Sequence, residues 1–258
     1  FKKILLPLTP EYIGYSDAGY GTEEIFNSIR PDIHFEEDNI FKYHIDFENL
    51  AVGDDIGAIC VSRPTNPTGN LLSGNEIEKL VEIASANDIP LIIDNAYGSP
   101  FPDIVFSEAL PYWNKNIVMC LSLSKLGLPG VRTGIVVASE QIIAALSQIN
   151  AVMNLAPGSV GAVLTGELVK TGEIINVSRD IIKPFYKSKA DFAVNLFKEH
   201  LRGTDFFIHK PEGAIFLWLW FRGIKIDSHE LYKRLKERGV LVVSGHYFFP
   251  GLSDPWQH

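Results

Sequence analysis

The stretch IGAICVSRPTNPTG, residues 56–69, decides the fold because a continuous apolar run leads directly into polar residues and turn formers. A run of this kind, bounded by Pro and Gly, is typical of a strand buried on both faces of a parallel sheet. Two later stretches repeat the pattern, PLIIDNAYG at residues 90–98 and NIVMCLSLSK at residues 116–125. The sequence therefore predicts an α/β fold with a mostly parallel sheet and crossover helices.

Polar residues stand where these three runs end. Asn66, Asp94 and Lys125 follow one another at intervals of 28 and 31 residues. Each interval is about the length of a strand, a crossover helix and the next strand. Because the carboxyl ends of parallel strands meet at one edge of a sheet, we expect these residues to lie close together.

A lysine amine and a carboxylate at one sheet edge can bind the same cofactor. Lys125 can hold an aldehyde cofactor as a Schiff base, and Asp94 can pair with a pyridinium nitrogen and keep it protonated. The Tyr97 hydroxyl and the Asn66 amide can both hydrogen-bond a phenolate oxygen on the same ring. Ser122 and Arg132 can supply a hydroxyl and a guanidinium fork for a phosphate. These residue types together predict a pyridoxal 5'-phosphate site.

The motifs NPTG (66–69), DNAYG (94–98) and SLSKLGLPGVRTG (122–134) resemble the cofactor-binding segments of fold-type I, class I aminotransferases. The resemblance spans almost the whole chain and is strongest for the branch that acts on valine and pyruvate. It implies that Lys125, Asp94 and Tyr97 are catalytic. It also implies the following cofactor-binding residues: Tyr12, Asn66, Asp94, Tyr97, Ser122, Ser124, Lys125 and Arg132. Tyr12, in TPEYIGY, matches the aromatic position that stacks on the cofactor ring.

One spacing departs from most class I members. Arg132 follows Lys125 by seven residues, whereas most members place this arginine one residue later. The loop through Gly127, Pro129 and Gly130 must therefore be tighter. The valine–pyruvate branch is similar here, so we interpret the spacing as a mark of that branch.

Taken singly, each of these residues has an ordinary structural use. A lysine at a strand end is usually solvated, and an aspartate after an apolar run is usually a cap or turn residue. Asn66 can be a simple turn former, since Pro67 fixes φ and Gly69 permits positive φ. Packing alone hardly produces all these types in this order and at crossover spacing, which favours the cofactor site.

Composition and charge agree with a cytoplasmic enzyme that binds small molecules. The 258 residues are 46% hydrophobic and 21% charged, and the net charge of −8 argues against a nucleic-acid surface. No apolar run is long enough to cross a bilayer, and no secretory signal is recognisable. The seven histidines form no ligand cluster, so no metal site is expected. Cys60 and Cys120 lie in apolar runs and are expected to be buried, reduced thiols.

The pattern of elements predicts two domains. Residues 1–182 form the large cofactor-binding domain, and residues 183–258 begin with a long helix and continue as a smaller α+β domain. We expect strands at 2–8, 134–139, 206–211, 214–220 and 240–245. Helices are expected after the capping box Ser73-x-x-Glu76, ending near residue 87, and at 139–153 and 229–239.

Set against the family, both ends look incomplete, so we expect this chain to be a fragment. The phosphate-cradling loop would precede Phe1, and the arginine that binds the substrate carboxylate would follow His258. No residue here matches that arginine. Arg63 and Arg222 are candidates only by type, and for both a solvated surface role is expected.

The resemblance implies transfer of an amino group between an apolar amino acid, valine or alanine, and a 2-keto acid, pyruvate or 2-ketoisovalerate. It also implies a role in amino acid biosynthesis and a homodimer, with no nucleic-acid or membrane partner. One alternative is another fold-type I enzyme, a decarboxylase or an acyl-transferring synthase. Another is a ligand-sensing module of the kind fused to winged-helix regulators.

Overall fold

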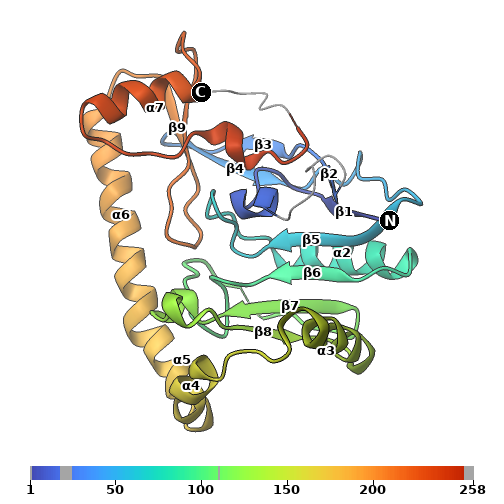
Figure 1. Cartoon of the computed structure of the whole chain (residues 1–258). Helices are drawn as coiled ribbons and strands as arrows, with labels where there is room; N and C mark the ends of the chain where they lie inside the picture. Colours follow the sequence, from blue (N-terminus) through green and yellow to red (C-terminus); the bar gives the residue numbers. More distant parts are fainter. Residues whose placement is uncertain (1, 18–24, 110, 253–258) are drawn as a thin grey trace.

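The computed structural model describes residues 2–17, 25–109 and 111–252. The two chain ends, Phe1 and residues 253–258, on which the fragment expectation turns, lie outside these ranges. A six-stranded sheet of order β2-β1-β5-β6-β7-β8 forms the centre (Figure 1). Its strands are β1 (Lys3–Leu6), β2 (Phe26–Ser28), β5 (Ile56–Ser62), β6 (Leu91–Asp94), β7 (Ile117–Ser122) and β8 (Gly134–Val137). Only the β7–β8 pairing is antiparallel, which confirms the mostly parallel α/β prediction.

The main core lies between this sheet and helix α2 (Gly74–Ala86). Ser73 and Glu76 form the predicted capping box, which satisfies backbone N–H groups that the first turn leaves unpaired. The buried side of the helix presents Ile77, Leu80, Val81 and Ala84 to Ile59, Leu91, Ile93 and Ile117 of the strands. Truncating a fully buried residue such as Leu80 to alanine typically costs about 2–5 kcal/mol.

Strand register brings the polar ends of the central strands to one edge. Ser62 at the end of β5 pairs with Asp94 at the end of β6, and Asp94 pairs with Cys120 on β7. Ser122 is the last residue of β7 and pairs with Gly134 of β8. The loops that carry the predicted site residues therefore leave the sheet side by side, as expected for parallel strands.

A second sheet of order β10-β9-β4-β3 packs beside the first. Its strands are β3 (Asp32–Phe35), β4 (Ile40–His44), β9 (Phe206–His209) and β10 (Leu219–Phe221). The parallel β4–β9 pairing joins strands from the two sides of residue 182. The division into domains 1–182 and 183–258 remains a prediction.

Two of the expected strands differ from the structure. Residues 240–245 form no strand: Val240–Val243 are partly or largely exposed and only the short 3₁₀ helix η5 (Gly245–Phe248) follows. In AIFLWLW (214–220), strand geometry begins only at Leu219. An apolar composition favours a strand, but a strand also needs a partner edge, and β9 offers one only to residues 219–221.

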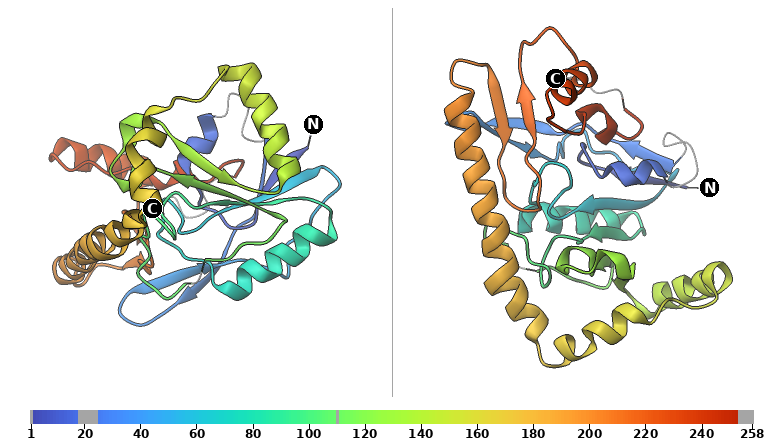
Figure 2. Two further views of the ribbon diagram at one scale, coloured as in Figure 1. Left: turned by 90° about the horizontal axis from the view of Figure 1, so that it is seen from below. Right: turned by 60° about the vertical axis from the view of Figure 1, so that its left-hand side comes forward.

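The remaining helices lie towards the C-terminal half of the chain. They are α3 (Glu140–Asn154), α4 (Val160–Lys170), α5 (Glu173–Val177), α6 (Lys183–His200) and α7 (Ser228–Glu237), with a π-helical turn at Ser178–Ile182. Helix α6 runs along one side of the molecule from α5 to the strand β9 (Figures 1 and 2). The expected helices at 139–153, 183–201 and 229–239 are thus present with small shifts at their ends.

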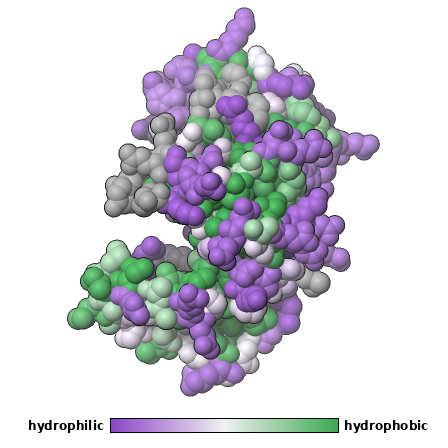
Figure 3. All heavy atoms as spheres, turned by 90° about the vertical axis from the view of Figure 1, so that its right-hand side faces the viewer, coloured by the Kyte–Doolittle hydropathy of each residue, from purple (hydrophilic) through white to green (hydrophobic). Residues whose placement is uncertain are grey.

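Helix α3 exposes several large apolar side chains. Ile149, Val152, Met153 and Leu155 are all more than half exposed, and Val152 reaches 88%. Apolar residues gather in the lower part of the face drawn in Figure 3. A contiguous apolar surface of this kind is typical of a contact site. None of the described helices is both long and apolar enough to cross a membrane.

Candidate active site

A cavity of about 440 Å³ opens at the carboxyl edge of the central sheet. Its size falls within the range of roughly 300–1,000 Å³ that is usual for small-molecule sites. All eight predicted site residues line it: Tyr12, Asn66, Asp94, Tyr97, Ser122, Ser124, Lys125 and Arg132. Asn66, Asp94 and Lys125 are thus brought together as the strand spacing predicted, and Tyr12 joins them from the start of the chain. Their individual roles remain proposals.

Asp94 is a poorly solvated acid at the floor of this cavity. Its Oδ1 accepts the backbone N–H of Ala96 at 3.1 Å, and its Oδ2 accepts the Tyr15 hydroxyl at 3.4 Å. Neither donor is charged. Burial raises the pKa of Asp94, because the ionised form has lost water without gaining a cation. A protonated ring nitrogen beside this carboxyl would reverse that effect.

Tyr97, in the loop that follows β6, lies beside Asn66, in the loop that follows β5. Tyr97 is only 5% exposed, and burial raises the pKa of its hydroxyl, which a hydrogen bond with the Asn66 side chain partly offsets. The turn that carries Asn66 depends on Gly69, whose φ is +71°. A Cβ on Gly69 would lie 2.6 Å from the carbonyl oxygen of Gly213, so only glycine fits there.

Lys125 lies in the 3₁₀ helix η2 (Ser124–Leu126), directly after β7. Its Nζ is 5.3 Å from the centroid of the Tyr97 ring. The Ser122 hydroxyl accepts the backbone N–H of Ser124 at 3.1 Å, which turns the chain at the strand end. Gly127, with φ of +109°, ends η2. The turn thereby places Lys125 at the cavity, which its side chain helps to line.

Arg132 closes the tight loop inferred from the seven-residue spacing. A second 3₁₀ helix, η3 (Pro129–Val131), compresses this loop, and Arg132 adopts left-handed φ and ψ of 47° and 48°. Its Nη1 donates to the Pro129 carbonyl at 3.4 Å, and the side chain is exposed. A non-glycine residue in this conformation is uncommon and often marks a functional position.

Tyr12 stands at the mouth of the cavity. It is 40% exposed, and its ring meets that of Tyr15 edge to face, with centroids 5.7 Å apart and planes at 86°. The edge-to-face contact fixes the ring while leaving much of it uncovered. That arrangement suits stacking against a flat heterocycle.

Three polar residues around Asp94 were missed by sequence reasoning. Glu11, Tyr15 and Ser62 form a buried group between β5, β6 and the 3₁₀ helix η1 (Ile13–Asp17). Glu11 gave one signal that could have been used, because it is an acid inside the largely apolar stretch LLPLTPEYIGY (5–15). Ser62 gave another, because it ends β5 as Asp94 ends β6.

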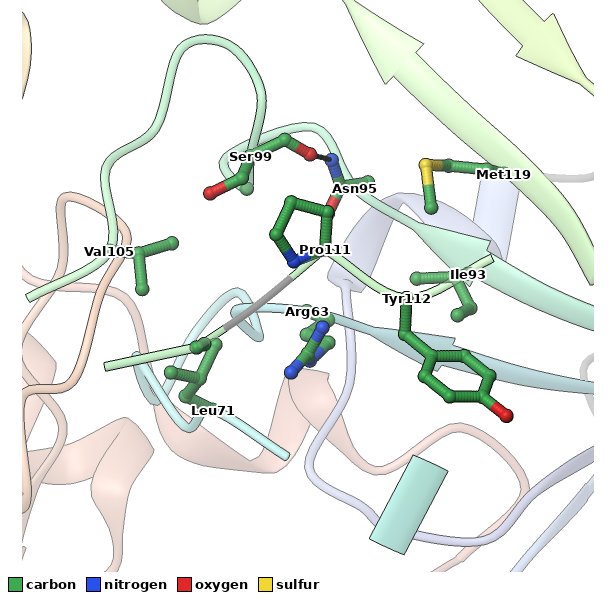
Figure 4. A pocket seen from close by; sticks show the side chains of 11 residues that line it. Arg63, Leu71, Ile93, Asn95, Ser99, Val105, Pro111, Tyr112 and Met119 are labelled. Atoms are coloured by element: carbon green, nitrogen blue, oxygen red, sulfur yellow. Dashed lines mark hydrogen bonds between the residues drawn. The ribbon is translucent and has the colours of Figure 1, made fainter. Parts of the chain in front are cut away.

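The expectation for Arg63 was wrong. Its side chain is buried rather than solvated, and its Nε donates to the Leu72 carbonyl at 3.0 Å. Figure 4 shows it in a separate small pocket, together with Asn95 and Tyr112. That pocket has a volume of about 10 Å³, room for no more than a water molecule. The Leu72 carbonyl offsets part of the cost of burying this arginine, because buried polar groups need hydrogen-bond partners.

Arg222 keeps the surface role expected for it. It is exposed, pairs with Asp205 at 3.1 Å and lies over the rings of Phe35 and Phe207. Cys60 and Cys120 are both free thiols, as expected, although only Cys60 is fully buried. Neither arginine lines the candidate active site, so neither is a candidate for binding a substrate carboxylate there.

The donor set of the cavity fits pyridoxal 5'-phosphate. It offers an amine for the aldehyde, an acid without a cationic partner for the ring nitrogen, and a phenol with an amide for the ring oxygen. The hydroxyls of Ser122 and Ser124 and the guanidinium of Arg132 are suited to a phosphate. An exposed aromatic ring completes the set.

Comparison with known proteins agrees with this chemistry. The sequence model of the family "Aminotransferase class I and II" matches residues 33–251. The chain therefore belongs to the class I and II aminotransferase family. It is 53% identical over 257 residues to a valine–pyruvate aminotransferase of Escherichia coli (strain K12), covering all of this chain and 61% of that protein.

A solved structure and a more distant relative extend the comparison. The crystal structure of valine-pyruvate aminotransferase from Salmonella typhimurium LT2 superposes with a TM-score of 0.93 at 51% identity, over 100% of this chain and 65% of that one. The HTH-type transcriptional regulator NorG of Staphylococcus aureus (strain USA300) is 25% identical over 95% of this chain and 54% of its own length. The chain thus spans less than two thirds of the length of these relatives.

Proposed function

We propose that this chain carries the catalytic centre of a pyridoxal 5'-phosphate-dependent aminotransferase. The enzyme would move an amino group between an apolar amino acid, valine or alanine, and a 2-keto acid, pyruvate or 2-ketoisovalerate. One observation carries the proposal: the Lys125 amine and the Asp94 carboxyl line the same cavity as Tyr97, Asn66 and Arg132. The 53% identity to a valine–pyruvate aminotransferase supports the choice of substrates.

When bound, pyridoxal 5'-phosphate supplies an aldehyde that condenses with amines and a protonated ring that withdraws electrons from the substrate α-carbon. Lys125 would hold the aldehyde carbon. Asp94 would hold the proton on the ring nitrogen, and Tyr97 and Asn66 would hydrogen-bond the ring oxygen. The phosphate would be held by Ser122, Ser124 and Arg132, and Tyr12 would cover one ring face.

Lys125 would also move the proton that amino transfer requires. As a neutral amine it takes the proton from the substrate α-carbon and returns it at the cofactor's aldehyde carbon. The lysine lies in the short helix η2, which places its Cα beside the cavity, and its flexible side chain can reach both carbons. Tyr97, over whose ring the amine lies, would limit the positions that the amine can take.

Two alternatives use parts of the same site. A fold-type I decarboxylase or acyl-transferring synthase would need the same lysine and acid but break another bond. A ligand-sensing module of a transcription regulator would bind the cofactor without turnover, and the NorG relative is named an HTH-type transcriptional regulator. Its 25% identity against 53% for the aminotransferase makes amino transfer the better-supported function.

The cellular setting belongs to the same proposal. We place the enzyme in the cytoplasm, in amino acid biosynthesis, as a homodimer. The exposed apolar side chains of α3 support a protein contact surface, and a second copy of the chain is the proposed partner. Sedimentation velocity of the purified protein tests this, and a monomer at micromolar concentration would contradict it.

The function is tested by an absorbance scan of the purified protein with pyridoxal 5'-phosphate. An imine band is expected, and added valine should shift it to the spectrum of the amine form of the cofactor. Adding pyruvate should restore the first band and yield alanine. Release of carbon dioxide instead would favour the decarboxylase, and a band that no amino acid shifts would favour the sensing module.

A further inference from the structure

A buried glutamate lies beneath the candidate active site, and the proposed reaction assigns it no role. Glu11 is 1% exposed. Its Oε1 accepts the Ser62 backbone N–H at 2.8 Å, and its Oε2 lies 3.2 Å from the Tyr12 backbone nitrogen and 2.6 Å from Ser62 Oγ. All three contacts are with uncharged groups. A carboxylate removed from water in such surroundings is costly, so this position requires an explanation.

Ser62 and Tyr15 connect Glu11 with Asp94. Ser62 Oγ lies 3.4 Å from the Tyr15 hydroxyl oxygen. The Tyr15 hydroxyl in turn lies 3.4 Å from Asp94 Oδ2, to which it donates. Stacking on Phe26, with ring centroids 5.6 Å apart and planes at 25°, holds the Tyr15 ring in place. Four polar groups therefore form one line from Glu11 to the acid of the cavity.

The number of available protons sets the direction of this line. Tyr15 has one hydroxyl proton, which points to Asp94 because an ionised carboxylate only accepts. An ionised Glu11 accepts the Ser62 hydroxyl at 2.6 Å, and the serine proton is then not directed at Tyr15. A protonated Glu11 can donate to Ser62 Oγ in the same contact, which leaves the serine proton for Tyr15. A neutral acid can still accept from both backbone N–H groups, so all five contacts are satisfied together.

We propose that Glu11 is a positioning residue that carries a proton at neutral pH and, through Ser62 and Tyr15, directs a line of hydrogen-bond donors at Asp94. The inference rests on the proposed function, because Asp94 matters as the partner of the cofactor's ring nitrogen. Donors aimed at Asp94 favour its ionised form. A second carboxylate at Glu11 would instead oppose it.

The electrostatic surroundings agree with this assignment. Burial raises the pKa of Glu11 to about 8, and the charge of Asp94 on β6 raises it too, against the hydrogen bonds from Ser62, which lower it. Burial also raises the pKa values of Cys60 on β5 and of Tyr15, so both are neutral at pH 7. Two neighbouring acids share one negative charge more readily than they carry two.

Within residues 2–17, 25–109 and 111–252, the other hydrogen bonds of Glu11 are with backbone groups. From η5, the backbone carbonyl of Phe248 accepts the Glu11 N–H at 2.9 Å. Tyr12, the next residue, offers its backbone N–H, while its ring faces the cavity. Asp94 is therefore the group with which Glu11 competes for negative charge.

The proton on Glu11 is tested directly in the cofactor-free protein. Infrared difference spectra between the wild type and Glu11→Gln should show the carbonyl band of a protonated carboxylic acid at pH 7. That band should disappear on raising the pH through about 8. Glu82→Gln, at an exposed position of α2, controls for the loss of any glutamate. A carboxylate band at pH 7 in place of the acid band would overturn the proposal.

The positioning role is tested by the dissociation constant for pyridoxal 5'-phosphate, measured by tryptophan fluorescence at pH 7. The amide in Glu11→Gln keeps a donor towards Ser62 Oγ and an acceptor for its N–H, so binding should stay close to wild type. Glu11→Ala removes the first group of the line, and Tyr15→Phe removes the hydroxyl that contacts Asp94. Each should weaken binding by about tenfold or more, which is the usual cost of removing a residue that orients a ligand-binding side chain. Wild-type binding by Glu11→Ala would overturn the proposal.

Circular dichroism shows whether Glu11→Ala folds. If it does not fold, Glu11→Gln still tests the proposal. Weak binding by a folded Glu11→Gln would show that Glu11 acts as an anion, against the proposal. A wild-type protein that binds no pyridoxal 5'-phosphate would contradict the proposed function instead. The infrared result would still decide where the proton lies.

Discussion

The Lys125 Nζ lies 5.3 Å from the centroid of the Tyr97 ring, so the amine and the phenol that would flank the cofactor face each other across one cavity. The two residues come from loops that follow neighbouring parallel strands, β6 and β7. Each of the two residues can therefore be tested by its own substitution. Removing the Lys125 amine should leave the pocket in place, because Tyr97 still lines it, so the chemistry of the amine can be tested apart from the shape of the pocket.

Lys125→Ala should abolish the imine band and lower the rate of amino transfer by at least about a thousandfold, because both the covalent hold and the proton carrier are lost. The cavity itself should remain, so the variant should still bind pyridoxal 5'-phosphate non-covalently. Absorbance and a single-turnover assay with valine measure the two effects. Lys189→Ala, on the exposed side of α6, is the matched control and should behave as wild type. Normal exchange by the Lys125 variant would refute the assignment.

Asp94→Asn should lower activity while leaving the cofactor-free protein as stable as wild type or more so. Burial raises the pKa of Asp94, so its ionisation at neutral pH opposes folding, and the amide removes that cost. The amide oxygen can still accept the Ala96 N–H. We expect a loss in activity of about a hundredfold or more, because a neutral amide does not keep the ring nitrogen protonated. Thermal unfolding measures the stability, which should be unchanged or higher, and steady-state kinetics measures the activity, which should fall. A loss of both stability and activity would point to a folding defect.

Arg132 should matter for the phosphate and hardly for the rest of the cofactor. Arg132→Lys keeps the charge but loses the guanidinium fork, and Arg132→Gly loses both while relieving a left-handed backbone that costs roughly 1–2 kcal/mol. Binding of pyridoxal 5'-phosphate should weaken in the order wild type, Lys, Gly. Binding of pyridoxal, which has no phosphate, should change little in either variant. Equal losses for the two ligands would remove Arg132 from the phosphate site.

The central sheet and the site could be predicted because local sequence determines them. The apolar runs at 56–61 and 117–121 form the bodies of β5 and β7, and the serine that ends each strand, Ser62 or Ser122, lies at the carboxyl edge. The pairing of β4 with β9 could not be predicted, because more than 160 residues separate the strands and neither sequence specifies its partner. Residues 240–245 look like a strand by composition, but they pair with none of the described strands.

Burial of polar groups was the other feature that the sequence did not reveal. Glu11 and Arg63 are residue types that usually lie at the surface, and both are buried here by tertiary contacts with Ser62 and Leu72. Long-range packing, and not local pattern, provides their partners. The residues that line the cavity were therefore easier to identify than the residues that support them.

The pH dependence of stability should contain a contribution from His209, a fully buried histidine that bridges the second sheet. Its Nε2 accepts the Tyr43 backbone N–H at 3.2 Å and its Nδ1–H donates to the Lys210 carbonyl at 2.9 Å, so the neutral ring satisfies both. Burial, helped by the charge of Lys42, lowers the pKa of His209 from 6.5 to about 3. Between pH 6.5 and about pH 3, His209 is therefore protonated in the unfolded chain and neutral in the folded protein.

The contribution of His209 to the free energy of unfolding is therefore fully present above pH 6.5. It is lost as the pH falls towards about 3, with a slope of up to about 1.4 kcal/mol per pH unit. His209→Gln should be less stable at pH 7, by about 1–3 kcal/mol for the disturbed Tyr43 N–H. Its disadvantage should shrink between pH 6.5 and pH 4, because glutamine does not titrate. Urea unfolding at several pH values measures both quantities, and His200→Gln, at the exposed end of α6, controls for the loss of any histidine. A gap between wild type and His209→Gln that stays constant over this range would show that His209 does take up a proton in the folded protein.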